Sequence, residues 1–316
     1  MKSWGIEQRG TLSNLKCLEA AKPVITADKV LVRVKAAGLN LADLKVIKGG
    51  VGRFLHSNKF PLFMGYDFSG IVESIGAGVS SFVQGDEVYG FLPYDSSNAQ
   101  GAYSEYVLVS PAEIARRPDN ISFEDAASLP TTAGTALTAV RDVGEVKRGM
   151  KVFINGASGG VGCYAVQIAK ILGAEVVGSC SQEKMEFVNA LGARAVDYRT
   201  TSITALSEKF DLIFDAASTS WFRQCARSLV KGGKFITLLP TPALILGFIE
   251  SFFVEKSCHF VYGKSKTVDL LQLGSWIEEN QMVAKVEQVY PLKKLPEALG
   301  YLQSGKTKGK LVVTVS

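Results

Sequence analysis

One stretch of the sequence constrains the fold more than any other, residues 151–170, which read KVFINGASGGVGCYAVQIAK. A short apolar run at Val152–Ile154 predicts a strand, a glycine-rich turn follows it, and Val161–Lys170 has the apolar periodicity of a helix. A further apolar run at Glu175–Gly178 predicts a second strand. A strand, a glycine turn, a helix and a second strand in this order are typical of a dinucleotide-binding unit.

The glycines of this turn are spaced as a pyrophosphate-binding turn requires. Gly156 would allow the tight turn, Gly159 would let the backbone approach a pyrophosphate, and Gly162 would let helix and strand pack closely. The free N–H groups of the helix N-terminus favour a bound anion. A flexible loop or a methyltransferase nucleotide site has similar glycines, but the surrounding strand and helix favour a nicotinamide cofactor. The predicted cofactor-binding residues of the turn are Gly156, Ser158, Gly159, Gly160, Val161 and Gly162.

Length and composition narrow the class of protein. At 316 residues the chain is long enough for two domains. Its net charge of +5 is modest, and the absence of a basic stripe with interleaved aromatic residues argues against nucleic-acid binding. The five cysteines are scattered and form no CxxC pair, so we expect a reducing compartment. No apolar run could span a bilayer and no signal core is present at the start, so we expect a cytoplasmic protein.

The pattern of predicted secondary structure changes after about the first third of the chain. Residues 1–110 are β-rich, with strands predicted at Lys29–Ala36, Gly70–Ile75 and Tyr103–Val109, which is typical of a barrel or sandwich module. From about Ser122 helices and strands alternate, which predicts a doubly wound parallel sheet. The predicted fold class is therefore α/β with two domains. The later predicted strands are Ala195–Val196, Leu212–Asp215, Phe235–Leu239 and Lys310–Val315.

Several motifs resemble a known family. The segments LPTTAGTAL at 129–137, NGASGGVG at 155–162 and GKTKGKLVVTV at 305–315 resemble the medium-chain dehydrogenase/reductase superfamily, more narrowly its zinc-independent quinone oxidoreductase branch. MGYDFSGIVESIG at 64–76 and QGDEVYG at 84–90 are similar to plant enone reductases and the chloroplast quinone oxidoreductase homologue. The resemblance covers nearly the whole chain.

This resemblance implies a domain arrangement. We expect a GroES-like catalytic domain at residues 1–121, completed by residues 263–316, and a Rossmann NADPH-binding domain at residues 122–262. It implies that substrate and nicotinamide meet in a cleft between the domains. It also implies a homodimer formed through the Rossmann sheet.

The end of the second strand of a dinucleotide unit discriminates between NAD and NADP. NAD sites usually place an acidic residue there to bind the ribose 2′-hydroxyl. Residues 178–181 contain no acid, and Ser179, Ser181 and Lys184 supply hydroxyls and a cation suited to a 2′-phosphate. Glu183 weakens this interpretation unless it points to solvent, and Lys184 has the alternative role of solvating a helix start. We predict NADPH rather than NADH.

The resemblance implies further contacts with the cofactor. It places Tyr198 beside Lys184 around the 2′-phosphate. It also places Thr135, Leu239 and Pro240 near the nicotinamide.

Zinc-dependent relatives bind their metal with an early cysteine and with the histidine of a Gly-His-Glu motif. In this chain the two regions read GLNLADLK at 38–45 and GYD at 65–67, and the four closely spaced cysteines of a structural zinc lobe are absent. Only His56 and His259 occur in the sequence, and neither has a partner at ligand spacing. We expect no metal.

Hydride transfer without a Lewis acid needs an acceptor that is already electrophilic, such as a quinone or an α,β-unsaturated carbonyl. The two segments that stand where zinc-dependent relatives bind their metal offer three hydrogen-bond donors as catalytic candidates, Asn40, Lys45 and Tyr66. The resemblance favours Lys45 for contact with the carbonyl, and Tyr66 stands in the histidine position, where it could donate a proton. In the alternative interpretation, Asn40 and Asp43 only shape a turn and Tyr66 only packs beside the cofactor.

Two stretches late in the chain have a weaker signal. One of Lys306, Lys308 and Lys310 could reach the cofactor's phosphate, but a solvated run of charges is the default interpretation. The apolar stretch Pro242–Val254 is too short and too interrupted to span a membrane. A cleft wall or a dimer contact is favoured there over peripheral membrane contact.

Together these features predict an NADPH-dependent oxidoreductase that transfers hydride to a quinone or an α,β-unsaturated carbonyl (an enone or enal) without a metal. A zinc-type alcohol dehydrogenase is the rival enzyme, and the missing ligands argue against it. An NADPH-binding redox sensor or crystallin-like protein with little turnover is the rival from another class, because a fold alone does not fix a function.

Overall fold

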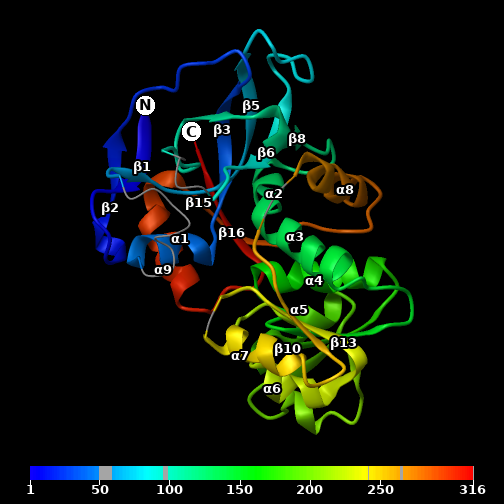
Figure 1. Cartoon of the computed structure of the whole chain (residues 1–316). Helices are drawn as coiled ribbons and strands as arrows, with labels where there is room; N and C mark the ends of the chain where they lie inside the picture. Colours follow the sequence, from blue (N-terminus) through cyan, green and yellow to red (C-terminus); the bar gives the residue numbers. More distant parts are fainter. Residues whose placement is uncertain (50–58, 95–98, 241, 264–265, 316) are drawn as a thin grey trace. The chain divides into compact units, whose positions relative to one another are not determined.

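The protein, analysed as a computed structural model, is described for residues 1–49, 59–94, 99–240, 242–263 and 266–315. The chain divides into two compact units, one made of Met1–Gly134 with Lys264–Ser316 and the other of Thr135–Gly263 (Figure 1). His56, noted in the sequence, lies outside the described residues.

The first unit is β-rich. Within its described residues it holds a seven-stranded sheet in the order β15-β16-β3-β5-β6-β8, with β7 paired to β3, and a three-stranded sheet in the order β2-β1-β4. Its strands are β1 (Lys2–Ile6), β2 (Leu15–Glu19), β3 (Val30–Gly38), β4 (Leu62–Phe63), β5 (Asp67–Ile75), β6 (Glu87–Phe91), β7 (Tyr106–Val109), β8 (Ile114–Arg116), β15 (Val286–Pro291) and β16 (Lys310–Thr314). Its helices are α1 (Leu41–Lys48), α2 (Phe123–Ala127), α8 (Thr267–Glu278) and α9 (Leu295–Gln303), and α1 and α9 lie side by side (Figure 1).

Strand β3 is the centre of this unit. Its even-numbered valines face the core, while Arg33 and Lys35 are only half-buried, as the period of two in a strand requires. The register pairs Gly38, at the end of β3, with Asp67 of β5 and with Val312 of β16, both antiparallel. Sheet pairing therefore brings together three segments that are distant in the sequence.

The boundary between the units lies at Gly134, later than the end at residue 121 that the resemblance implied. The extra residues belong to the first unit because they bond to its sheet. The Ser69 hydroxyl of β5 donates to the carbonyl of Phe123 at 2.6 Å, and the Thr131 N–H donates to Asp67 at 2.9 Å. Pro130 begins the helix α3 (Pro130–Leu137), since proline suits the first turn of a helix.

The second unit is a parallel α/β sheet. Within the described residues its strand order is β11-β10-β9-β12-β13-β14, and every neighbouring pair is parallel. Its strands are β9 (Lys151–Asn155), β10 (Glu175–Cys180), β11 (Arg194–Asp197), β12 (Phe210–Asp215), β13 (Leu229–Thr237) and β14 (Ser257–Phe260). Its helices are α4 (Gly160–Ile171), α5 (Met185–Ala190), α6 (Phe222–Cys225) and α7 (Pro242–Ser251). From β9 the chain adds β10 and β11 on one side of the sheet, then crosses back and adds β12, β13 and β14 on the other side. This strand order is the Rossmann topology, and the predicted α/β fold class is confirmed.

Some elements differ from the sequence prediction. The strand expected to reach Leu239 ends at Thr237. The strands β14 and β15 were not predicted. Most of the residues of β15 are exposed, so the strand has no alternation of apolar residues for sequence reasoning to detect.

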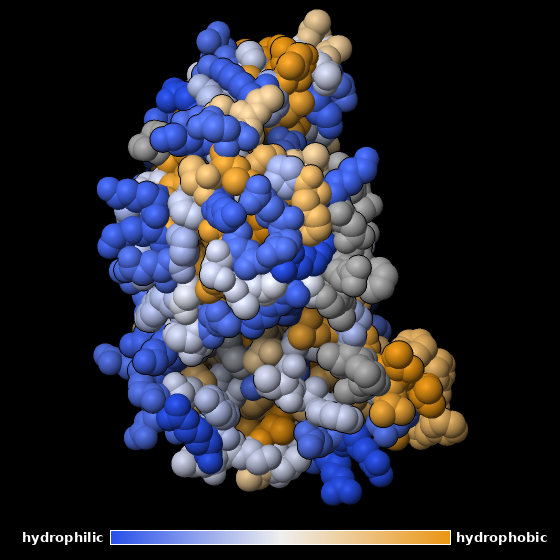
Figure 2. All heavy atoms as spheres, turned by 90° about the vertical axis from the view of Figure 1, so that its left-hand side faces the viewer, coloured by the Kyte–Doolittle hydropathy of each residue, from blue (hydrophilic) through white to orange (hydrophobic). Residues whose placement is uncertain are grey.

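Helix α7 and the turn after it expose many apolar side chains. The exposed fraction of Phe252 is 73% and that of Phe253 is 83%, and exposed Ile245, Leu246 and Phe248 precede them. Figure 2 shows hydrophobic side chains gathered in a protruding group on one face of the molecule. The choice among cleft wall, dimer contact and peripheral membrane contact stays a prediction. None of the helices in the described part of the chain has both the length and the apolar composition that crossing a membrane requires.

Candidate cofactor site and polar centre

The glycine turn joins β9 to α4, and its three key glycines meet different surroundings. Gly156 has a φ of +77°, and a Cβ there would lie 2.9 Å from the Cβ of Ala217. A Cβ on Gly162 would lie only 2.1 Å from the carbonyl oxygen of Gly156. A Cβ on Gly159 would meet nothing closer than that same carbonyl oxygen, at 3.4 Å. Folding therefore demands glycine at 156 and 162, whereas position 159 leaves room for a ligand, as a pyrophosphate-binding turn requires.

Side-chain hydrogen bonds tie this turn to the neighbouring strand ends. The Asn155 amide donates to Asp215 at 2.8 Å, and its oxygen accepts from the Ser179 hydroxyl at 2.6 Å. The Ser179 hydroxyl in turn accepts the N–H of Gly156 at 3.3 Å. Burial raises the pKa of Asp215, and a 2.7 Å bond from the Ser220 N–H opposes that rise. The ends of β12, β9 and β10 are thus linked, which fixes the place where the turn begins.

Ser179 therefore has contacts that its predicted role did not include. It is buried, and its hydroxyl both donates and accepts within the turn network. The structure places the remaining candidates for the 2′-phosphate, Ser181, Lys184 and Tyr198, just beyond the ends of β10 and β11. Tyr198 is exposed and its N–H donates to the carbonyl of Cys180 at 3.1 Å, so these two strand ends adjoin.

Two charged residues stand among these candidates. Glu183 accepts a 3.1 Å hydrogen bond from Arg199, and Arg199 lies 5.7 Å from the centre of the Tyr198 ring. Sequence reasoning did not include Arg199, although it directly follows Tyr198 in the sequence. Its position beside a predicted phosphate ligand was the signal that could have found it.

The three residues expected near the nicotinamide occupy two places in the second unit. Thr135 is buried within α3. Leu239 and Pro240 follow the end of β13, where Thr237 pairs with Asp215 of β12. Because the carboxyl ends of parallel strands share one edge of the sheet, Leu239 and Pro240 lie past the same edge as the glycine turn.

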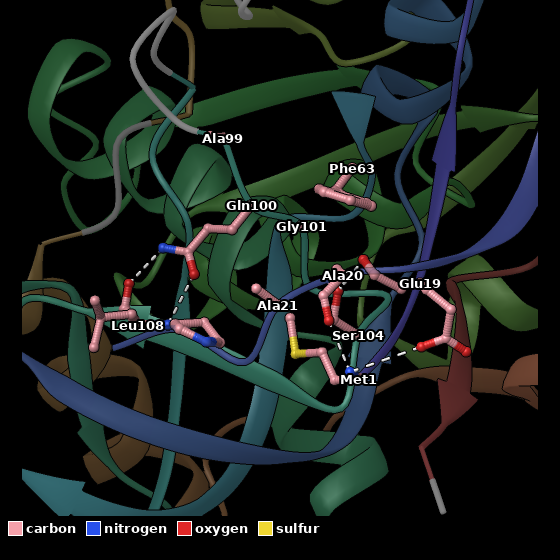
Figure 3. A pocket seen from close by; sticks show the side chains of 12 residues that line it. Met1, Glu19, Ala20, Ala21, Phe63, Ala99, Gln100, Gly101, Ser104 and Leu108 are labelled. Carbon is pink, nitrogen blue, oxygen red and sulfur yellow. Dashed lines mark hydrogen bonds and ion pairs between the residues drawn. The ribbon is translucent and has the colours of Figure 1, made fainter. Parts of the chain in front are cut away.

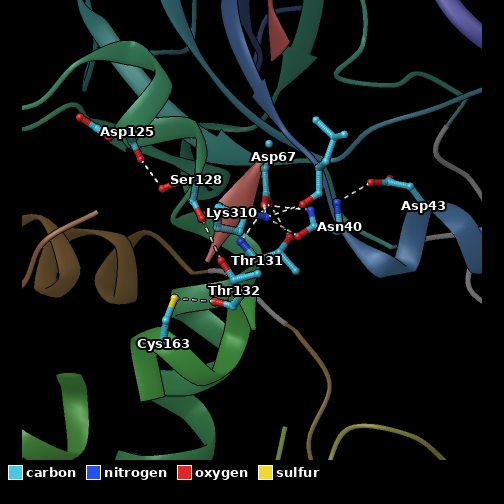
Figure 4. A network of polar contacts seen from close by, with 12 residues as sticks. Asn40, Asp43, Asp67, Asp125, Ser128, Thr131, Thr132, Cys163 and Lys310 are labelled. Atoms are coloured by element: carbon cyan, nitrogen blue, oxygen red, sulfur yellow. Dashed lines mark hydrogen bonds and ion pairs between the residues drawn. The ribbon is translucent and has the colours of Figure 1, made fainter. Parts of the chain in front are cut away.

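The first unit contains a buried ionic network that includes residues of the segments GLNLADLK at 38–45 and GYD at 65–67 (Figure 4). The Lys310 ammonium donates to the carbonyl of Leu39 at 2.6 Å and to the Asn40 side-chain oxygen at 2.7 Å, and it lies 3.8 Å from Asp67 Oδ2. The Asn40 amide donates to that same Asp67 oxygen at 3.0 Å. The side chains of Lys310 and Asp67 are only 2% and 0% exposed. The expectation of a solvated lysine is therefore wrong for Lys310, because β16 carries it into the core.

Asp67 is held on both oxygens. Its Oδ1 accepts the backbone N–H of Thr131 at 2.9 Å and the hydroxyl of the same residue (Figure 4). Burial raises the pKa of this carboxyl, and the Lys310 charge together with these hydrogen bonds counteracts the rise. A buried charge is tolerated only when it is paired and hydrogen-bonded, and Asp67 meets both conditions.

A second buried carboxyl adjoins the first. Asp43 Oδ2 accepts the N–H of Asn40 at 2.8 Å and the hydroxyl of Tyr103 at 2.7 Å. Its Oδ1 has no hydrogen-bond partner among the described residues. Complete burial raises the pKa of Asp43 to about 7, against the lowering effect of the Tyr103 hydroxyl. Asp43 thus caps the start of α1 from inside the core.

The three predicted catalytic residues differ sharply in their surroundings. Both polar ends of the Asn40 side chain are bonded within the network just described. Tyr66 is fully buried, its ring centre lies 4.0 Å from that of Tyr94, and burial raises its pKa well above 10.0. Lys45 lies on the exposed face of α1, and desolvation by the surrounding protein lowers its pKa.

The donor set of this centre does not fit a zinc ion. Its polar side chains are one amide, two carboxyls, two hydroxyls and a buried ammonium, and the ammonium is already the counter-ion of Asp67. Zinc sites use cysteine, histidine and carboxylate ligands in tetrahedral sets. Among the described residues, no group of three or more histidine, cysteine, aspartate or glutamate side chains could hold a metal ion.

A separate recess of about 580 Å³ lies in the first unit, and Met1, Glu19, Phe63, Gln100 and Ser104 are among the residues that line it (Figure 3). The Gln100 amide is bonded to both backbone groups of Leu108. None of the predicted site residues lines this recess.

Comparison with known proteins agrees with both units. The model of the alcohol dehydrogenase GroES-like domain matches residues 26–119, and that of the zinc-binding dehydrogenases matches residues 191–313. The chloroplastic quinone-oxidoreductase homologue of Spinacia oleracea is 31% identical over 96% of this chain and 95% of its own length. The chloroplastic NADPH-dependent alkenal/one oxidoreductase of Arabidopsis thaliana is 32% identical over 99% of this chain and 79% of its own length.

A solved structure shows the same likeness. The quinone oxidoreductase from Coxiella burnetii has a TM-score of 0.92 and 30% sequence identity, covering 100% of this chain and 99% of that one. The GroES-like unit, the Rossmann unit and the relatives that span nearly the whole sequence lead to one assignment. The chain belongs to the medium-chain dehydrogenase/reductase family of oxidoreductases.

Proposed function

We propose that this protein is an NADPH-dependent reductase of quinones or α,β-unsaturated carbonyls that works without a metal. The observation that carries the proposal is the buried network of Lys310, Asn40 and Asp67 at the positions of the zinc-type motifs. A site built this way offers no Lewis acid, so the acceptor must delocalise the added charge onto its own oxygen. Hydride addition to a quinone or an enone gives a delocalised phenolate or enolate, whereas addition to a simple ketone gives a localised alkoxide that no metal would stabilise here.

The choice of NADPH has support in the second unit. The glycine turn leaves the space at Gly159 that the pyrophosphate of either cofactor needs. The choice of NADPH rests on the end of β10, where residues 178–181 contain no acid and Ser181 and Lys184 supply a hydroxyl and a cation. A relative named as NADPH-dependent, at 32% identity, agrees with this choice. The bound nicotinamide would supply a hydride.

Lys45 is our candidate for the group that binds the acceptor oxygen. Lys45 is an exposed residue of α1, and the desolvation that lowers its pKa makes its ammonium a better proton donor than that of an ordinary lysine. A hydrogen bond from this ammonium would stabilise the enolate or hydroquinone oxygen as negative charge develops there.

Asn40 and Tyr66 are both buried, so their roles in this proposal differ from that of Lys45. The contacts of Asn40 favour the interpretation that it fixes the start of α1, and so the position of Lys45. Tyr66 is neutral at any physiological pH because its pKa is raised, so it is able to donate a hydrogen bond. We further propose that the protein is a homodimer and that it is located in the cytoplasm.

The test is a titration of the purified protein with NADPH and with NADH, followed by separate additions of 1,2-naphthoquinone and a short-chain enone while the absorbance of the nicotinamide is recorded. NADPH-selective oxidation with one acceptor is the expected result, and it chooses the substrate branch. Selective binding with no turnover across a broad panel of both acceptor classes would contradict the proposal and support a redox sensor or a crystallin-like role.

A further inference from the structure

The carboxylate of Glu183 has surroundings that are unusual for a glutamate at the surface. The side chains of Glu183 and Arg199 are 63% and 53% exposed, and Arg199 Nη1 lies 3.1 Å from Glu183 Oε1. Hydrogen bonds from the Ser181 hydroxyl, from the backbone of Glu183 itself and from Arg199 lower the pKa of Glu183 to about 2. The Arg199 guanidinium is thus the direct partner of this carboxylate, while the Ser181 hydroxyl and the Glu183 N–H also favour its charged form.

These three groups are the ones that proteins use to bind a phosphate monoester. Ser181 is itself a predicted ligand of the cofactor's 2′-phosphate, and Arg199 lies over the ring of Tyr198, another predicted ligand. Lys184 directly follows Glu183 in the sequence. The carboxylate therefore stands among the residues that a 2′-phosphate would have to reach.

We propose that the Glu183 carboxylate occupies the place of the 2′-phosphate until the cofactor displaces it, and that Arg199 then becomes a ligand of that phosphate. This inference rests on the proposed preference for NADPH. The exchange is physically reasonable because an exposed ion pair is weak and a phosphate carries more charge than a carboxylate. Glu183 would then lower the affinity for NADPH without affecting NADH, which has no 2′-phosphate.

The experiment measures binding, so it needs no turnover. Calorimetric titrations with NADPH, NADH, 2′,5′-ADP and 5′-AMP are made on the full chain and on Glu183→Gln. We expect Glu183→Gln to bind NADPH and 2′,5′-ADP about two- to fivefold more tightly, while its affinities for NADH and 5′-AMP are unchanged. A matched control is Glu186→Gln, which removes an exposed carboxylate three positions further along the chain and should change none of the four affinities.

Arg199 gives the second half of the test. Arg199→Gln should weaken NADPH and 2′,5′-ADP about tenfold and leave NADH and 5′-AMP unchanged, because it removes a charge-assisted hydrogen bond. Its control is Arg194→Gln, an exposed arginine that pairs with Glu208 instead. In the double variant of Glu183→Gln and Arg199→Gln, the loss of the carboxylate should raise the affinity for NADPH and 2′,5′-ADP less than it does alone. The reason is that Arg199, which the carboxylate would otherwise keep from the phosphate, is then absent.

The outcomes separate this inference from the function it rests on. If the unaltered protein binds 5′-AMP as well as 2′,5′-ADP, the NADPH preference itself fails. If it prefers 2′,5′-ADP but Glu183→Gln leaves that affinity unchanged, or shifts NADH equally, only the role of Glu183 is overturned. An Arg199→Gln variant with normal 2′,5′-ADP binding would remove Arg199 from the site.

Discussion

The ammonium of Lys310 donates a 2.7 Å hydrogen bond to the side chain of Asn40, which lies 270 positions earlier in the sequence. The same ammonium faces Asp67, and both charged side chains are almost fully buried. The start of β16, the end of β3 and the start of β5 are therefore joined by one cation. This relationship makes the centre of the first unit testable through stability.

Removing this cation should be costly. Lys310→Met leaves the Asp67 charge buried without its counter-ion, and we expect the free energy of unfolding to fall by about 3–5 kcal/mol. Urea denaturation followed by circular dichroism measures the change. The matched control is Lys308→Met, an exposed lysine two positions away, whose effect should stay within about 0.5 kcal/mol.

The double variant Lys310→Met with Asp67→Asn separates charge from packing. It should recover at least half of the loss, because no unpaired charge then remains in the core. Equal stability of Lys308→Met and Lys310→Met would show that the buried pair has no structural role.

Substitution of Gly159 should affect cofactor binding, whereas substitution of Gly162 should affect stability. Gly159→Val has space in the protein, so the variant should fold with a nearly unchanged melting temperature and lose NADPH binding. Gly162→Val places a side chain against the Gly156 carbonyl and should lower the melting temperature whether or not cofactor is added. Differential scanning fluorimetry and NADPH fluorescence measure both effects. Normal NADPH affinity in folded Gly159→Val would exclude the turn as the pyrophosphate site.

Asp43 should make stability depend on pH. Its pKa is about 7 in the folded protein and 3.8 ordinarily, so the folded state binds the proton more tightly. The stability that this proton brings is complete below pH 3.8 and is lost as the pH rises through 7. From pH 5 to pH 8, Asp43→Asn should therefore lose about 3 kcal/mol less stability than the unaltered protein. Urea titrations at several pH values test this, and parallel curves for the two proteins would show that Asp43 does not titrate there.

Lys45 should matter for turnover and not for cofactor affinity. With a quinone or enone acceptor, Lys45→Met should lower kcat about tenfold to a hundredfold, since a donor to the developing oxyanion is lost. The dissociation constant of NADPH should stay the same. Lys48→Met, which replaces another exposed lysine of the same helix, is the control and should keep its activity. An unchanged kcat for Lys45→Met would move the donor role to another residue.

Removal of metal should leave the reaction intact. After dialysis against EDTA and 1,10-phenanthroline, the rate of NADPH oxidation with the better acceptor should match that of the untreated protein. The reason is the donor set, in which the Lys310 ammonium occupies the polar centre. A rate that falls on chelation and returns with Zn²⁺ would overturn the metal-free proposal.

Local patterns in the sequence were enough to predict the turn of the second unit. Gly156, Gly159 and Gly162 act through backbone geometry within a few residues, and their different roles agree with the space around each of them. Alternation of strands and helices predicted the parallel sheet in the same way. Edge strands such as β15 were missed because their exposed residues have no apolar pattern.

The polar centre of the first unit depended on contacts between distant segments. Lys306, Lys308 and Lys310 look alike in the sequence, and only the pairing of β16 with β3 decides that Lys310 is buried while the other two are exposed. The sequence by itself determined the family motifs, the glycine turn and the loss of the zinc ligands. Only the tertiary structure decided which lysine faces Asp67, because strand register is set by the packing of the whole sheet and not by neighbours along the chain.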